Sequence, residues 1–352
     1  MSAHPRAKRV AQSIGVMIVS YRRPGPLLAC LDALAAQTRR PDDVMVVLRP
    51  DDAEAHAALA ARPAGALPWR IVPATAPGVV AARNAGLAAC RSDIVAICDD
   101  DTCAHPDWIA RILEHFARDP ELGGLGGRDR CHDGERFDEG RRDPVGHIAW
   151  YGRTVGNHHL GHGAAREVRY LKGANMSFRR EATAGVPFDA RLRGRTIQAH
   201  EDFAFSMAVR RGGWKLLYDP AVALDHYAFR GDATRRTYVA SKGLANAQDY
   251  ADQCYNHTLA LWDELSPASR AAFAVWAPLV GTRVHPGLLQ ALRLTPGERA
   301  TIWRKFLLCQ RANAAAYATG IAAMLARPRP PRVPVSAPVS APVSAIGKRE
   351  AS

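Results

Sequence analysis

The sequence predicts an α/β protein, with a mostly parallel sheet flanked by helices and a helical C-terminal extension. Between residues 13 and 104, short β-branched apolar runs alternate with segments of helical periodicity, as βαβ units require. From residue 234 to 325 the pattern is mostly helical. An apolar content of 47% over 352 residues supports a large core and excludes disordered and collagen-like classes.

The first third of the chain supplies four expected strands and four expected helices. The strands are the apolar runs 14–20, 44–48, 69–72 and 94–98. The helices are expected at 26–37, 53–61, 79–90 and 105–118. Crossovers of this kind are right-handed, and open parallel sheets bind ligands beyond the carboxyl ends of their strands. Chemistry is therefore expected just after residue 98.

The middle of the chain is less regular. The glycine-rich run 123–127 predicts a break, and the polar segment 128–163 predicts a long loop. We interpret His158, His159 and His162 as part of a mobile loop rather than as metal ligands. Regular pattern returns at 170–180, a helix is expected at 203–211 and a strand at 214–218, with Trp214 in the core, and a further run follows at 221–225. Breaks in the helical C-terminal part are expected at 266–267, 285–287 and 295–297.

The chain is basic, with 47 Lys and Arg against 34 Asp and Glu and a net charge of +13. Nucleic acid, an anionic membrane and a phosphorylated substrate are the partners that such a charge allows. The seven cysteines are scattered without a C-x-x-C pair, which favours buried reduced thiols. No apolar run reaches the ~20 residues of a membrane span, and no signal peptide is evident. We expect a cytoplasmic protein.

Three adjacent carboxylates, Asp99, Asp100 and Asp101, follow the strand at 94–98 directly. Such carboxylates repel one another unless a positive group lies among them. A divalent cation with oxygen ligands, Mg²⁺ or Mn²⁺, is one such group, and it commonly arrives with substrate phosphates. A solvated acidic loop is the alternative, as is helix capping by neighbours such as Asp107.

Several further motifs stand in a defined order around this triplet. They are SYRRP (20–24), RPDD (49–52), GVVAARNAGL (78–87), KGANMSFRR (172–180), HED (200–202) and DH (225–226). The ordered set, spanning about residues 13–230, resembles the family 2 glycosyltransferases, an inverting group with the Rossmann-like GT-A fold. The resemblance implies transfer of a sugar from a nucleotide-sugar donor, of UDP or GDP type, to a hydroxyl of a glycan, polysaccharide or lipid-linked acceptor. It also implies a Mn or Mg cofactor.

The resemblance also implies roles for individual residues. Asp202 takes the position of the general base, and Glu201 is its partner at the acceptor site. Cation ligands are implied at Asp99, Asp101 and His226, and a floor for the acceptor or donor sugar at Gly173 and Asn175. Nucleotide-sugar contacts are implied for Ser20, Tyr21, Arg22, Arg49, Asp51, Gly78, Arg83, Asn84, Asp99 and Asp100. Leu48-Arg49-Pro50 precedes Asp51 where many members have an acidic residue, so the choice of nucleotide stays open.

These residue types suit the chemistry independently of the resemblance. A carboxylate such as Asp202 can accept the proton of an attacking hydroxyl. A cation held by Asp101 and His226 would stabilise the leaving diphosphate, with Arg83 and Lys172 adding positive charge. The alternatives are a structural role for His226 and helix capping by Glu201 and Asp202.

Two other functions compete with glycosyl transfer. A metal-dependent nucleotidyltransferase shares the sheet and the acidic ligands, but its glycine-rich loop is missing after the first strand, where Tyr21 to Gly25 contain one glycine. A non-catalytic nucleic-acid-binding protein would concentrate basic and aromatic residues on one face, whereas the arginines are spread along the chain. We expect no nucleic-acid partner.

The expected organisation has four parts. Residues 1–12 form a flexible basic tail, 13–232 a GT-A catalytic domain, 233–326 a helical extension, and 327–352 a Pro-rich disordered tail with a repeated VSAP motif. The run Trp303–Leu308 mixes cationic and apolar residues, so the C-terminal helices either contact the inner face of the plasma membrane peripherally or pack against the catalytic domain.

Overall fold

The computed structural model describes residues 12–326 except 63, 64, 66, 133, 196 and 228–245, and it leaves out the side chains of 295–300. The proposed boundary at 232/233 and nearly all of the two expected tails lie outside the described residues.

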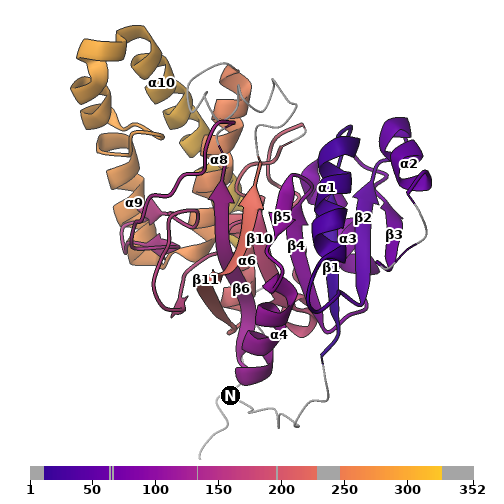
Figure 1. Cartoon of the computed structure of the whole chain (residues 1–352). Helices are drawn as coiled ribbons and strands as arrows, with labels where there is room; N and C mark the ends of the chain where they lie inside the picture. Colours follow the sequence, from indigo (N-terminus) through magenta and orange to yellow (C-terminus); the bar gives the residue numbers. More distant parts are fainter. Residues whose placement is uncertain are drawn as a thin grey trace, which may run out of the picture.

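A nine-stranded sheet forms the centre of the molecule (Figure 1). The strand order is β3 (Trp69–Pro73), β2 (Asp43–Leu48), β1 (Ile14–Val19), β4 (Ile94–Asp99), β10 (Asn175–Arg179), β6 (Leu122–Cys131), β11 (Lys215–His226) and β5 (Thr102–Ala104), with β9 (Arg166–Glu167) paired to β11. The four strands expected in the first third are confirmed and run parallel. Strand β10 lies antiparallel between β4 and β6, and the pair β6–β11 is parallel again.

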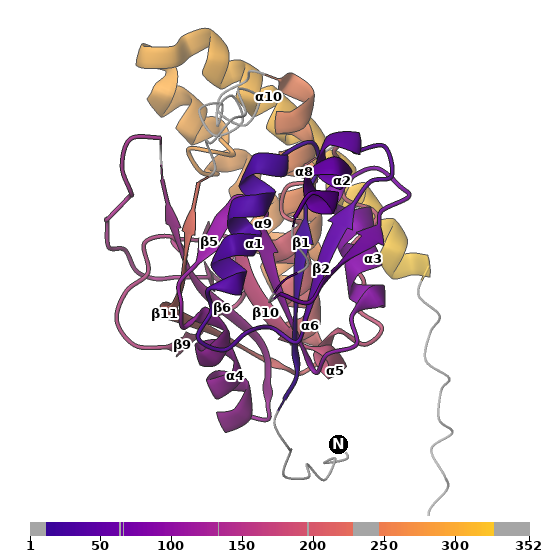
Figure 2. The same ribbon diagram turned by 45° about the vertical axis from the view of Figure 1, so that its right-hand side comes forward.

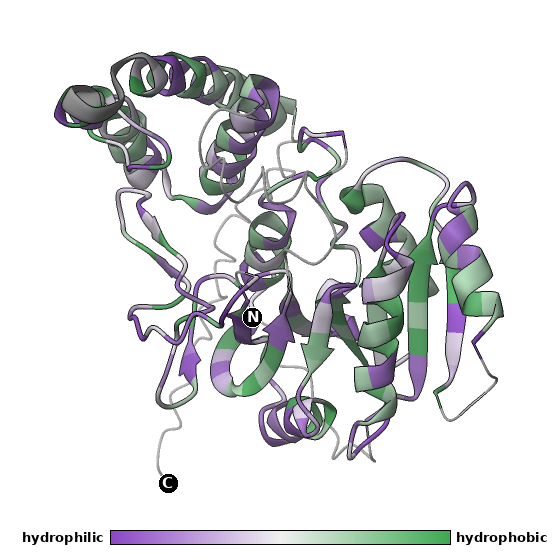
Figure 3. Cartoon of the chain, turned by 45° about the horizontal axis from the view of Figure 1, so that its top comes forward, coloured by the Kyte–Doolittle hydropathy of each residue, from purple (hydrophilic) through white to green (hydrophobic). Residues whose placement is uncertain are grey.

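Helices cover both faces of the sheet (Figure 2). Alternate residues of β1 explain the two layers: Val16 and Ile18 belong to one buried cluster, and Met17 belongs to the other. The first cluster contains residues of α1 (Pro24–Ala35), α2 (Ala53–Ala60) and α4 (Trp108–Arg118). The second contains residues of α3 (Val79–Ala89), α5 (Arg180–Thr183) and α6 (Glu201–Arg211). Figure 3 shows the resulting apolar strands and the more polar segments that join them.

The prediction of a break at residues 123–127 is wrong, because these glycines lie inside β6. A Cβ atom on Gly123 would lie 2.3 Å from Cβ of Trp214, and one on Gly124 would lie 2.6 Å from Cδ2 of Leu216. The glycines therefore leave room for large side chains that arrive from a distant part of the chain. Trp214 itself is partly buried and packs against the second cluster, as expected.

The segment 128–163 is also more ordered than expected. It contains the end of β6 and a hairpin of β7 (His147–Ile148) and β8 (Thr154–Val155). His158 is buried, and its Nε2 lies 3.1 Å from the backbone oxygen of Tyr170. The interpretation of the histidines as a mobile tract is therefore wrong for His158.

The two expected strand runs near 214–225 form one strand, β11. Its pairing with β6 shifts between Asp219 and Ala223, where Pro220 brings no N–H group to the ladder. Beyond this bulge, β11 ends at His226, which pairs with Cys131 of β6 and Thr102 of β5.

Within residues 246–326, the described C-terminal part contains α8 (Ala247–Glu264), α9 (Pro267–Leu279) and α10 (Leu288–Ala326). The breaks expected at 266–267 and 285–287 are confirmed. The break expected at 295–297 is wrong, because α10 continues through these residues, although it bends in Figure 1. A third buried cluster joins Phe203 and Met207 of α6 to Leu259 of α8 and Ala316 of α10. The extension thus packs against the α/β domain.

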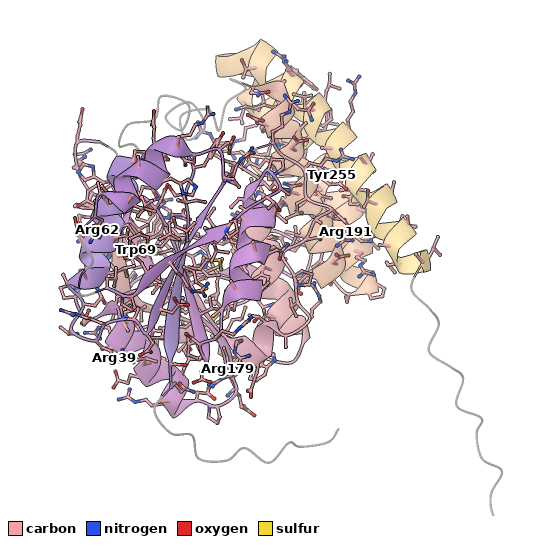
Figure 4. All side chains as sticks on the ribbon, turned by 90° about the vertical axis from the view of Figure 1, so that its right-hand side faces the viewer. Arg39, Arg62, Trp69, Arg179, Arg191 and Tyr255 are labelled. Atoms are coloured by element: carbon pink, nitrogen blue, oxygen red, sulfur yellow. The ribbon has the colours of Figure 1, made fainter. Side chains whose placement is uncertain are left out.

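Ion pairs reinforce this contact. The buried carboxylate of Glu264 on α8 forms an ion pair with Arg210 of α6. It forms a second ion pair with Arg169, whose Nη2 lies 3.2 Å from Oε1 of Glu264. Arg191 pairs with Asp263, and Figure 4 shows Arg191 and Tyr255 on the side of the molecule where the C-terminal helices lie. Among the described helices, none combines the length and hydropathy that a bilayer span needs.

Candidate active site

A cleft of about 3230 Å³ opens at the carboxyl ends of β1 and β4 and extends to the C-terminal helices. Most small-molecule sites have volumes of about 300–1,000 Å³. The cleft therefore has room for two substrates. Predicted site residues that line it are Ser20, Tyr21, Arg22, Arg49, Gly78, Arg83, Asp99, Asp100, Gly173, Glu201, Asp202 and His226.

Arg23 neutralises two carboxylates of the acidic triplet. Its Nη1 donates to Asp100 at 2.6 Å and its Nη2 donates to Asp101 at 2.9 Å. Burial alone lowers the pKa of Arg23, but Asp100 and Asp101 outweigh it and raise the pKa. The Ser20 hydroxyl donates to Asp100 at 2.6 Å. The inner part of the triplet is thus a buried ion-pair network, which the solvated-loop alternative does not describe.

Arg83 connects the end of β4 to the start of α6. Its guanidinium is buried, with Nη1 2.9 Å from Glu201 and Nη2 3.2 Å from Asp99. Burial lowers the pKa of Arg83, but these carboxylates raise it above its usual value. Because two of its nitrogens already bind carboxylates, Arg83 positions Glu201 relative to Asp99.

Two backbone N–H groups orient the Asp202 carboxylate. Gly173 N donates to Oδ2 at 2.6 Å, and Phe203 N donates to Oδ1 at 2.7 Å. The second bond satisfies an amide in the first turn of α6, as the capping alternative predicts. Each carboxylate oxygen has a further lone pair, so Asp202 retains acceptor capacity at the cleft.

His226 lies between two carboxylates. Its Nε2 is 3.3 Å from Asp101 Oδ1, and its Nδ1 is 3.5 Å from Asp129 Oδ2. Asp99, Asp101 and His226 bring one ligand atom each within 4.8 Å of one another, and so do Asp129, Cys131 and His226. Both ring nitrogens of His226 and Oδ1 of Asp129 are buried and make no hydrogen bond of standard geometry among the described residues, so the imidazole faces the two carboxylates only through these longer contacts. This mixed nitrogen and oxygen donor set fits a divalent cation.

The family model for glycosyl transferase family 2 matches residues 15–185, which include β1, the acidic triplet and Gly173. Residues 15–185 are a family 2 glycosyltransferase domain. The fold agrees with two solved glycosyltransferase structures. One is the mannosyltransferase PcManGT from Pyrobaculum calidifontis in complex with GDP-Man and Mn²⁺, with 15% identity, 90% of each chain covered and a TM-score of 0.50. The other is S. aureus TarS in complex with UDP-GlcNAc, with 14% identity, 89% of this chain and 91% of that chain covered, and a TM-score of 0.51.

A curated relative is the glucosyl-dolichyl phosphate glucuronosyltransferase of Haloferax volcanii, 27% identical over 157 residues. The match covers 43% of this chain and 48% of the relative. The chain thus matches about half the length of this relative. The GT-A fold expected from the sequence is confirmed by these likenesses.

Some predicted contacts of the glycosyltransferase lie elsewhere. Asn84 does not line the cleft among the described residues; its amide binds the backbone N and O of Phe188 at 2.8 and 3.0 Å. Asn175 is also behind the cleft wall, where it accepts from Trp108 Nε1 and donates to the oxygen of Val222. Both amides therefore bind other segments of the chain in this structure.

The end of the cleft beside β1 and β2 carries positive charge around one aromatic ring. The guanidinium groups of Arg22 and Arg49 lie 5.0 and 5.3 Å from the centre of the Tyr21 ring. Arg49 also pairs with Asp51 at 2.8 Å, and Asp51 is exposed outside the cleft lining. These residues follow β1 and β2, as expected.

Sequence reasoning missed three groups in this glycosyltransferase. Arg23 lies in the SYRRP motif, which was the available signal. Asp129 follows the glycine strand and forms an ion pair with Lys172; burial lowers the pKa of Lys172, but Asp129 raises it. The ammonium group of Lys172 is therefore bound to Asp129 in this structure. The third group combines His200 of the HED motif with His257 and His285, which come from two other segments and lie in no motif.

Proposed function

We propose that the chain transfers a glycosyl group from a nucleotide sugar to an acceptor hydroxyl with inversion at the anomeric carbon. The observation that carries this proposal is the Asp202 carboxylate, which two backbone amides fix at the cleft between the donor end and the C-terminal helices. Asp202 accepts the proton of the acceptor hydroxyl as its oxygen bonds to the anomeric carbon. The bond from that carbon to the diphosphate breaks in the same step, on the opposite face.

The donor binds at the carboxyl ends of β1 and β2 in this proposal. Tyr21, Arg22 and Arg49 form an aromatic and cationic surface suited to a base and phosphates. A UDP or GDP sugar is favoured, because the two structural neighbours hold GDP-Man and UDP-GlcNAc.

Asp99, Asp101 and His226 would hold a divalent cation. When bound, this ion supplies Lewis-acid stabilisation of the diphosphate leaving group. Asp129 orients His226 through the ring nitrogen that does not face Asp101. Arg83 binds Glu201, the neighbour of Asp202, and also Asp99, so it fixes the position of this pair relative to Asp99.

The acceptor is proposed to be a glycan or a lipid-linked sugar. The curated relative is named for a glucosyl-dolichyl phosphate, which favours a lipid-linked acceptor. Peripheral membrane contact by α10 would suit such a substrate. Leu289, Leu292 and Leu307 on this helix are each more than half exposed, and Arg293 is exposed beside them.

The test uses the full chain with MnCl₂ and a panel of UDP and GDP sugars, and follows nucleoside diphosphate release and sugar transfer. We expect Asp202→Asn to reduce turnover at least 100-fold while nucleotide binding, measured by calorimetry, stays within threefold. Asp101→Ala should lose both turnover and nucleotide binding. Glu114→Gln, an exposed carboxylate of α4, is the matched control. Near wild-type turnover in Asp202→Asn would overturn the proposal, and pyrophosphate release from a nucleoside triphosphate would support the nucleotidyltransferase instead.

A further inference from the structure

Three histidines from separate segments meet in the cleft beside Asp202. His200 precedes α6, His257 lies on α8 and His285 lies between α9 and α10. The ring centres of His200 and His257 are 5.0 Å apart, and those of His257 and His285 are 4.8 Å apart. All three line the cleft. His200 is two residues from Asp202, so their Cα atoms are within about 7 Å.

The backbone at His200 is strained to place this ring. His200 has φ of 69°, in the left-handed region that side chains other than glycine rarely adopt. Such strain is retained where the surrounding structure fixes it, and it concentrates at functional sites. Here Asn256, the neighbour of His257, donates to the oxygen of Ala199 at 2.9 Å. Helix α8 therefore fixes the ring of His257 and the peptide that carries His200 together.

Burial lowers the pKa of all three imidazoles, which favours their neutral form near pH 7. The neighbouring rings add to this effect for His257, whose pKa lies well below its usual value, and the pKa of His285 is lowered to about 3. A neutral imidazole offers one N–H donor and one nitrogen acceptor. Nε2 of His200 and of His285 is buried and has no hydrogen-bond partner within the described structure. A ligand with hydroxyl groups would supply partners of both kinds.

An aromatic wall continues from the histidines. Thr154 Oγ1 lies 3.1 Å from His257 Nε2, and Tyr151, three residues earlier in the same hairpin, has its ring centre 5.3 Å from that of Trp276. Tyr151 and Trp276 also line the cleft. Apolar flat surfaces beside neutral donors and acceptors suit a sugar ring, whose C–H face is apolar and whose edge carries hydroxyls.

We infer that His200, His257 and His285, with Tyr151 and Trp276, form a subsite for an uncharged glycosyl unit of the acceptor. This inference rests on the proposed function, and it adds the part of the cleft that holds the acceptor. The sugar bound there presents its hydroxyl to Asp202. The arrangement does not suit a metal ion: the described residues give no set of ligand atoms from these three histidines within 4.8 Å.

The test measures binding of p-nitrophenyl α- and β-glycosides of glucose, galactose, mannose and N-acetylglucosamine by saturation-transfer NMR and calorimetry. The full chain is used with MnCl₂ and either UDP or GDP. At least one glycoside is expected to bind, equally well at pH 6 and pH 8. His257→Leu and His285→Gln should each weaken this binding at least tenfold and leave nucleoside diphosphate binding within twofold. His147→Asn, at an exposed position, is the matched control and should change neither glycoside binding nor nucleoside diphosphate binding.

The outcomes separate this subsite from the proposed function. A chain that binds a nucleoside diphosphate, but either binds none of the glycosides or binds them equally well in both variants, overturns the subsite alone. One equivalent of Zn²⁺ retained in dialysis and lost in His257→Leu also overturns it, in favour of a metal centre. A wild-type chain that binds neither UDP nor GDP with Mn²⁺ contradicts the proposed function, whatever the glycosides do. If His257→Leu does not fold, Trp276→Ala with His285→Gln decides the question.

Discussion

The side chain of Asn256 binds both backbone groups of Arg193. Arg193 N donates to Asn256 Oδ1 at 2.7 Å, and Asn256 Nδ2 donates to Arg193 O at 2.8 Å. The same nitrogen also donates to Ala199 O. One fully buried amide of α8 thus fixes both ends of the segment that leads to the Glu201–Asp202 pair.

Replacing Asn256 by Ala should therefore affect stability and activity together. The backbone groups left without partners cost about 2–4 kcal/mol in the free energy of unfolding. Turnover should fall more than nucleotide affinity, because the base is displaced while the donor end is unchanged. Urea unfolding followed by circular dichroism measures the first effect and nucleoside diphosphate release the second. Thr301→Ala, at an exposed position of α10, is the control; equal effects of the two substitutions would contradict the prediction.

Arg83 gives a prediction about charge. Burial already raises the pKa of Glu201 to about 8, and Arg83 is the main group that opposes this shift, so Glu201 takes up a proton in Arg83→Met. The cost in unfolding free energy should therefore stay below the roughly 3–5 kcal/mol of a broken buried ion pair. The double variant Arg83→Met/Glu201→Leu should recover part of this loss, since the buried carboxyl group left without its partner is removed as well. A double-mutant cycle of unfolding free energies measures the coupling. Additive losses would show that the two side chains do not interact.

Buried His158 predicts a fall in stability with acidity. Burial lowers its pKa to about 4, whereas an unfolded histidine titrates near 6.5. Below about pH 6.5 the unfolded chain binds a proton that the folded chain does not bind until about pH 4, so stability falls as the pH drops through this window. Between pH 7 and pH 5 His158 should account for roughly 2 kcal/mol. As the pH drops from 7 to 5, the urea midpoint of His158→Asn should decrease less than that of the wild type. His147→Asn, exposed on β7, should match the wild type.

Asp129 gives a prediction about the cation. Asp129→Asn removes the charge that faces Nδ1 of His226, and loss of such an orienting carboxylate weakens metal binding about 10- to 100-fold. Calorimetry of MnCl₂ binding in the presence of UDP or GDP measures the affinity without relying on turnover. Glu114→Gln should bind Mn²⁺ as the wild type does. An unchanged Mn²⁺ affinity in Asp129→Asn would remove this residue from the site.

Local sequence predicted the first half of the sheet well, since buried strands such as Val44–Leu48 are continuous apolar runs whose type does not depend on distant residues. It failed for β6, because the glycines of this strand have low strand propensity and are explained only by Trp214 and Leu216, which arrive about 90 residues later.

The site residues also divide into those that local sequence predicts and those that only distant contacts explain. Carboxylates that end a predicted strand, such as Asp99 to Asp101, could be located from the sequence. The contact that the amide of Asn84 makes with the backbone of Phe188, a partner 104 residues away, could not be predicted from the sequence. Asp129, His257 and His285 lie in no motif, and only the folded chain brings Asp129 to His226 and the two histidines to the cleft beside His200.

The bulge in β11 has a consequence for how this strand tolerates change. Between Asp219 and Ala223 the strand advances by four residues while β6 advances by one, from Gly127 to Arg128. Beyond the bulge, the pairing of His226 with Cys131 and Thr102 sets the side toward which the imidazole emerges. Deleting one residue from the spacer either shortens the unpaired bulge or shifts this pairing by one residue, and a shift by one residue turns the imidazole to the opposite face. The length of this segment, rather than its composition, is therefore what selection on the cation site is expected to preserve.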